Sequence, residues 1–206
     1  MKPGVWAAWT ALAAALAYDA AQILEVSGLL RDPLDRILIF APSLLLAPAF
    51  VVAVSATLDG ATPEQRTWRR ASTCLALLYA AMVGFVYVVQ LGAVIPADLA
   101  GGRPDVTPFA CCAPGRPLTS VDLLGYTYMA VSLLLLAPTY RRPALRTLLV
   151  ANGLLAPILI GQLRWPALIW LGALWIPFFA AAMVLLALEL GRRPDAVTRE
   201  GLARER

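Results

Sequence analysis

Histidine is absent from the 206 residues, and lysine occurs only once, as Lys2. Without histidine the chain lacks the commonest metal ligand, the usual haem ligand and the usual general base near neutral pH. The three cysteines, Cys74, Cys111 and Cys112, form no CxxC pair, so a thioredoxin-type redox centre is not expected. The sequence also lacks a P-loop, a G-x-S-x-G elbow and a zinc-finger spacing. We therefore expect no metal and no cofactor.

Charged residues are scarce as well. They make up 15% of the chain, whereas 60% is hydrophobic; soluble domains average ~25% charged and roughly 45–50% apolar residues. The apolar residues occur in long runs, and a helix that crosses a bilayer needs ~20 of them. Alternating segments of the kind found in outer-membrane barrels are not visible. The sequence predicts an all-α integral membrane protein.

The apolar runs predict a bundle of six transmembrane helices. A loop at 96–118, rich in proline and glycine, separates the third span from the fourth, and a basic tail covers 191–206. The two-residue connection at 164–165 requires the last two spans to form a tight antiparallel hairpin. The expected spans are 4–26, 34–58, 71–95, 119–138, 145–163 and 166–190.

Basic residues predict how the chain is threaded. With the N-terminus in the cytoplasm, twelve Lys and Arg residues fall on the inner side and five on the outer side. This positive-inside bias predicts that both termini are cytoplasmic and that the loop at 96–118 lies outside. Because the basic residues lie between apolar spans, we expect the lipid bilayer, and no nucleic acid, as partner. The excess of arginine and alanine is typical of a GC-rich bacterial genome, which suggests a cell (inner) membrane location.

The N-terminus has a second interpretation. A charged start, an apolar core and the sequence Ala15-Leu16-Ala17 resemble a secretory signal that is cleaved before Tyr18. Against cleavage, apolar residues resume at Ile23, and Trp6 suits an interfacial anchor. Charge bias is compatible with both interpretations.

Polar side chains inside the spans are candidate ligand-binding residues, because polar and ionisable groups in lipid are costly and face protein or water. With the predicted threading, they gather in the outer half of several spans. In the first span, Tyr18, Gln22 and Glu25 share one 120° sector with Asp19 at 100° per residue. The candidate ligand-binding residues are Asp19, Gln22, Tyr87, Gln90, Asp122, Tyr126 and Gln162.

Three functions are compatible with this pattern. The first is binding or transport of a small polar or cationic ligand, or of protons, through an outward-facing acidic cavity. The second is a structural or accessory subunit whose polar groups hold helices together. The third is an intramembrane enzyme that uses Asp19 and Asp122 as acid and base on a lipid-like substrate. Cys111 and Cys112 either form a vicinal disulfide, take a lipid or partner, or are two small loop residues. The distribution of polar and apolar residues predicts no particular oligomeric state.

Overall fold

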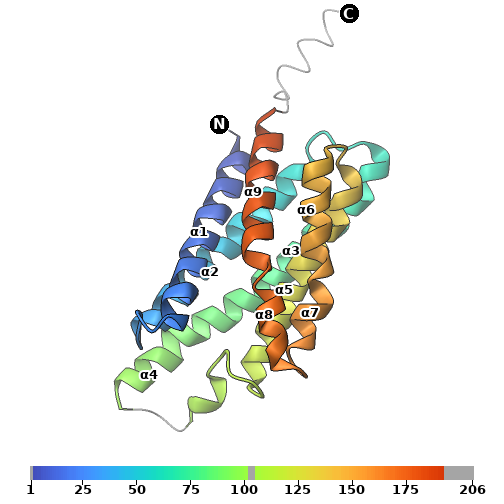
Figure 1. Ribbon diagram of the computed structural model, residues 1–206. Coiled ribbons are helices and arrows are strands. Elements are labelled where there is room, and N and C mark those ends of the chain that lie inside the picture. Colours follow the sequence, from blue (N-terminus) through green and yellow to red (C-terminus); the bar gives the residue numbers. More distant parts are fainter. Residues whose placement is uncertain (1, 102–104, 193–206) are drawn as a thin grey trace, which may run out of the picture.

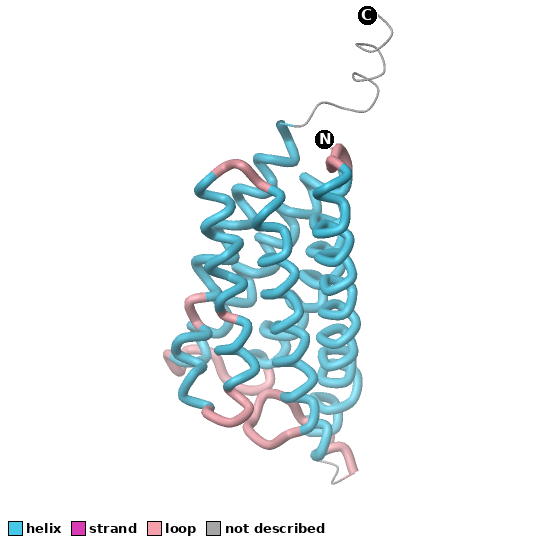
Figure 2. Tube along the Cα trace, turned by 90° about the vertical axis from the view of Figure 1, so that its right-hand side faces the viewer, coloured by secondary structure: helices cyan, strands magenta, loops and turns pink. Residues whose placement is uncertain are grey.

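The computed structural model describes residues 2–101 and 105–192, and all regular structure within them is helical. The described residues contain six helical runs that are long and apolar enough to cross a membrane, which confirms the prediction of six such helices. The helices lie side by side along one long axis (Figure 2). Residues 193–206 of the predicted tail and residues 102–104 of the predicted outer loop lie outside the described residues.

The first two helices form an antiparallel hairpin, α1 (Pro3–Val26) and α2 (Leu34–Ser55). The next helix, α3 (Pro63–Val89), passes through a wide π-helical turn at Gln90–Val94 into α4 (Ile95–Leu99). The remaining helices are α5 (Pro117–Leu136), α6 (Pro143–Leu154), α7 (Ala156–Gly161), α8 (Ile169–Gly172) and α9 (Trp175–Arg192).

Local sequence explains where several of these helices begin. Proline is the first residue of α1, α3, α5 and α6, a position where its missing N–H is not needed and its fixed φ suits the helix. The helix α3 begins at Pro63, ahead of the apolar run that starts near residue 71, because Gln65 caps it: its side chain accepts a hydrogen bond from the Thr62 N–H (3.4 Å). The connection between α2 and α3 is therefore shorter than the apolar runs alone suggest.

The bundle has two distinct ends (Figure 1). The described N-terminus and the end of α9 lie at one of them, which we call the termini end. The other, which we call the loop end, carries the connections 27–33, 105–116 and 162–165. The most extensive helix contacts are those of α1 with α2 and of α3 with α5.

Close packing and polar contacts join α3 to α5. Ser72 Oγ donates to the Ser132 carbonyl (2.8 Å), and Ser132 Oγ donates to the Ser72 carbonyl (2.9 Å). Toward the loop end the helices meet at Gly125, where an added Cβ would lie 2.9 Å from Val83 Cγ1. Small residues and hydroxyl pairs of this kind are typical of helix interfaces in membranes. The contact fixes the position of α5, which carries much of the candidate site.

Arg69 ties three segments together at the termini end. Its side chain is 4% exposed, and its Nε donates to Thr139 Oγ1 (3.2 Å). The guanidinium also donates to the carbonyls of Thr57 and Thr139, and it lies over the Tyr140 ring. Arg69, which is one of the twelve basic residues assigned to the cytoplasmic side by the predicted threading, is therefore buried in the packed bundle.

Candidate functional site

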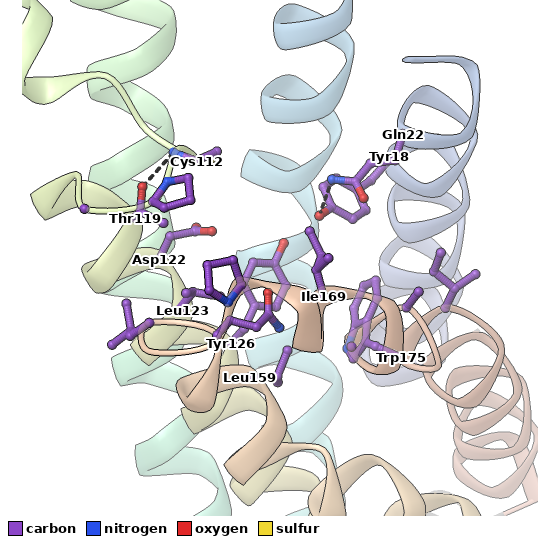
Figure 3. A pocket seen from close by; sticks show the side chains of 18 residues that line it. Tyr18, Gln22, Cys112, Thr119, Asp122, Leu123, Tyr126, Leu159, Ile169 and Trp175 are labelled. Atoms are coloured by element: carbon purple, nitrogen blue, oxygen red, sulfur yellow. Dashed lines mark hydrogen bonds between the residues drawn. The ribbon is translucent and has the colours of Figure 1, made fainter. Parts of the chain in front are cut away.

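A cavity of about 350 Å³ lies at the loop end (Figure 3). Its walls come from α1, from the loop at 112–115, from α5 and α7, and from the segment 166–176. It reaches the surface at the loop, because Cys112, Pro114 and Gly115 are exposed and line it. Its polar and aromatic lining residues are Tyr18, Gln22, Thr119, Asp122, Tyr126, Gln162 and Trp175.

Asp122 provides the cavity's carboxylate. It shares one face of α5 with Thr119 and Tyr126, which are three residues before it and four after it. The Asp122 Oδ1 atom is buried and has no hydrogen-bond partner among the described residues. No lysine or arginine of the described part of the chain lines the cavity. Removing an ion from water costs several kcal/mol unless a partner compensates, so this carboxylate is suited to a ligand that carries positive charge or N–H donors.

The helix α1 provides the opposite wall. Tyr18 and Gln22 are four residues apart and therefore lie one above the other, and Gln22 Nε2 donates to the Tyr18 hydroxyl (2.9 Å). Figure 3 shows these two side chains across the cavity from Asp122. A ligand in the cavity would thus have the carboxylate on one side and an amide and a phenol on the other.

Trp175, the first residue of α9, lies between these walls. Its ring meets the Tyr18 ring edge to face, with centroids 6.0 Å apart, and the Tyr126 ring in the same way at 5.8 Å. On its far side it stacks on Phe179, with centroids 4.7 Å apart. Three aromatic rings therefore line a cavity that also holds a carboxylate, which is the arrangement that organic cations favour.

Two of the candidate residues support the cavity without lining it. The Tyr87 hydroxyl donates to the Tyr126 hydroxyl (3.0 Å) and also interacts with the Asp122 carboxyl. Gln90, at the start of the π-helical turn, holds the loop: its Nε2 donates to the Phe109 carbonyl (2.8 Å), and its Oε1 accepts from the Cys111 N–H (3.0 Å). Both therefore position groups that do line the cavity.

Asp19 lies apart from the other candidates. It is 4% exposed, its Oδ1 has no hydrogen-bond partner among the described residues, and it does not line the cavity. The geometry of α1 explains the separation, because Tyr18 and Gln22 are 40° apart around the helix whereas Asp19 is rotated 60–100° from them. Within the 120° sector that these residues share, Tyr18 and Gln22 therefore face the cavity, whereas Asp19 is buried away from it. Of the two carboxylates that the enzyme hypothesis needs, only Asp122 therefore lines this cavity.

The structure brings together four of the seven candidates, Gln22, Asp122, Tyr126 and Gln162, at one cavity. Trp175 was not among the residues predicted from the sequence; it lies where the sixth apolar run is interrupted between α8 and α9, and hydropathy gives no sign of that interruption. Tyr18 was not predicted as a ligand-binding residue either, although its spacing of four from Gln22 was a usable signal.

Comparisons of the chain with protein-family models, with curated proteins and with solved structures found no match.

Proposed function

We propose that the protein is an integral membrane protein that binds a small organic cation in a cavity facing the outside of the cell. The single observation that carries the proposal is the buried, unpartnered Oδ1 of Asp122 in a cavity lined by aromatic rings and by no described basic side chain.

Membrane insertion is supported by the outer surface of the bundle. Large apolar side chains are exposed along several helices, among them Leu45, Leu77, Phe85 and Trp170. Soluble monomers rarely expose apolar patches larger than a few hundred Å², whereas lipid would cover such side chains. The positive-inside bias then supports cytoplasmic termini and an outward-facing loop end.

The ligand class follows from charge and size. A carboxylate with aromatic neighbours favours an ammonium group, because each ring attracts a cation by roughly 0.5–2 kcal/mol. The amides of Gln22 and Gln162 add hydrogen-bonding capacity on other walls. Small-molecule sites usually occupy ~300–1,000 Å³, so a cavity of about 350 Å³ suits a ligand the size of a simple alkylamine or choline.

Thermal unfolding of the purified full-length protein tests the proposal. The probes are ammonium, butylammonium, tetramethylammonium and choline chlorides, each at matched ionic strength with sodium chloride as the reference. We expect at least one organic cation to raise the melting temperature, because a ligand that binds only the folded state stabilises it by mass action. Failure of all three organic cations to exceed ammonium and sodium would overturn the proposal.

Asp122→Asn tests whether the carboxylate is responsible. A hydrogen bond to a charged group contributes about 1.5–3 kcal/mol to binding. We therefore expect this variant to bind the organic cation that stabilises the wild type most at least about tenfold more weakly. Asp98→Asn is the matched control, because Asp98 lies at the loop end, pairs with Arg36 (2.6 Å) and does not line the cavity. Equal affinity in Asp122→Asn and wild type would show that the Asp122 carboxylate is not responsible for cation binding and would overturn the assignment of this cavity as a cation site.

A further inference from the structure

Cys111 and Cys112 are joined by a disulfide at the edge of the cavity, and their backbone is held from two helices. The Cys111 N–H donates to Gln90 Oε1, and the Cys112 N–H donates to Thr119 Oγ1 (2.8 Å). The Thr119 hydroxyl in turn donates to the Ala113 carbonyl (2.8 Å). None of these bonds uses a sulfur atom, so they would persist if the disulfide were reduced.

The two sulfur atoms lie beside the cavity's carboxylate. Both Sγ atoms and an oxygen of Asp122 lie within 4.8 Å of one another. Thr119 and Asp122 are three residues apart on the same face of α5. Because Thr119 holds the Cys112 backbone, it also places Cys112 next to the Asp122 carboxylate. The buried Asp122 Oδ1 lacks a hydrogen-bond partner among the described residues, which is an independent sign that a ligand belongs there.

We propose that reduction of the Cys111–Cys112 disulfide creates a zinc site made of the two thiolates and the Asp122 carboxylate. A dithiol donor supplies two electrons and two protons, its own sulfurs become a disulfide, and Cys111 and Cys112 become thiols. Zn²⁺ then displaces the two thiol protons, which pass to water, and two Zn–S bonds and one Zn–O bond form. While the disulfide persists the sulfurs carry no thiolate charge, and the site is closed to zinc.

The geometry fits a tetrahedral ion with one open position. Zinc binds thiolate sulfur at ~2.3 Å and carboxylate oxygen at roughly 2.0–2.2 Å, so neighbouring ligand atoms in a tetrahedron stand about 3.5–3.8 Å apart. The three ligand atoms already lie within 4.8 Å of one another, and reduction lets the sulfurs separate. Cys112 is exposed and lines the cavity, so the fourth position would face it. Soft thiolates favour zinc over calcium or magnesium.

Zinc titration of the full-length protein in detergent tests this site. The protein is prepared oxidised, or reduced with a phosphine that is then removed, and Zn²⁺ affinity is measured by competition with a chromophoric chelator. We expect one Zn²⁺ per reduced chain and at least tenfold weaker binding by the oxidised chain. Co²⁺ added to the reduced protein should give a thiolate-to-metal charge-transfer band. Equal zinc affinity in the two redox states would overturn the proposal.

Variants separate the ligands from the surroundings. Cys112→Ser and Asp122→Asn should each lower the zinc affinity of the reduced protein at least about tenfold, since even outer-sphere partners of a metal contribute 10–100-fold. Cys74→Ser and Asp98→Asn should match wild type. In the Cys74→Ser protein only Cys111 and Cys112 remain to be alkylated after reduction. Alkylating them should lower the zinc affinity by the same factor, without a mutation at the site. Zinc affinity that survives both Asp122→Asn and alkylation would refute the assignment.

Tyr18→Leu distinguishes this site from the proposed function. It removes an aromatic ring on the far wall, so it should weaken choline binding and leave zinc binding by the reduced protein unchanged. Zinc binding without any organic-cation binding would retain the metal site and remove the proposed function. Choline binding without redox-dependent zinc binding would support the proposed function and refute the metal site.

Discussion

Gly125→Ala should destabilise the bundle relative to Gly84→Ala. Both glycines lie inside helices, but they meet different surroundings. A Cβ at Gly125 would lie 2.9 Å from Val83 Cγ1 and 3.3 Å from Met82 Cβ, whereas a Cβ at Gly84 would meet nothing within 4 Å. Val83 is fully buried and β-branched, so it cannot turn its methyl group away. The helices α3 and α5 would have to separate.

The magnitude follows from two opposing effects. Alanine is more favourable than glycine in a helix by ~1 kcal/mol, and this gain is common to both variants. Overpacking costs typically ~1–3 kcal/mol and applies to Gly125→Ala alone. The difference in unfolding free energy between the two variants should therefore be about 1–3 kcal/mol, because the shared gain cancels.

Unfolding by sodium dodecyl sulfate of protein held in mild-detergent micelles, followed by circular dichroism, measures this difference. Since α5 carries Asp122 and Tyr126, Gly125→Ala should also weaken organic-cation binding, while Gly84→Ala should not. Equal or greater stability of Gly125→Ala would refute the close packing of α3 on α5.

Three further predictions concern the loop, the termini end and the threading. Gln90→Leu removes two hydrogen bonds of about 0.5–1.5 kcal/mol each, so amide exchange in the loop after α4 should accelerate on the order of tenfold, whereas Gln65→Leu at the other end should leave it unchanged. Arg69→Lys should lower the unfolding free energy by about 1–3 kcal/mol, because an ammonium cannot make the guanidinium's set of bonds; the exposed Arg70→Lys should be neutral, and equal effects would contradict the buried role of Arg69. Green fluorescent protein fused to the C-terminus should fluoresce and alkaline phosphatase fused there should be inactive, and the opposite pattern would reverse the predicted threading.

The helices were predictable because each apolar run is long and bounded by proline, glycine or charge. Helix ends were less so. The helix α3 begins at Pro63, ahead of the apolar run, and its start depends on a cap at Thr62 and Gln65. Hydropathy does not register such a cap, so the apolar run predicts a span but not the first residue of the helix.

The cavity was only partly predictable. The angle between side chains on one helix follows from sequence, which is why Gln22, Asp122 and Tyr126 could be chosen as polar positions. Which part of a polar sector faces a cavity depends on the neighbouring helices, so the separation of Asp19 from Tyr18 could not be foreseen. Gln90 bonds to backbone groups of an irregular loop, and no periodic pattern predicts such partners.

The most direct test of organic-cation binding pairs a charged ligand with its uncharged isostere. Choline and 3,3-dimethyl-1-butanol differ chiefly in a quaternary nitrogen replaced by carbon, and calorimetry can measure both on wild type and on Asp122→Asn. The cycle isolates the interaction between ligand charge and Asp122. We predict a coupling of at least ~1.4 kcal/mol, that is, a tenfold preference for choline that Asp122→Asn removes. A coupling near zero, with the two ligands binding alike, would contradict the account.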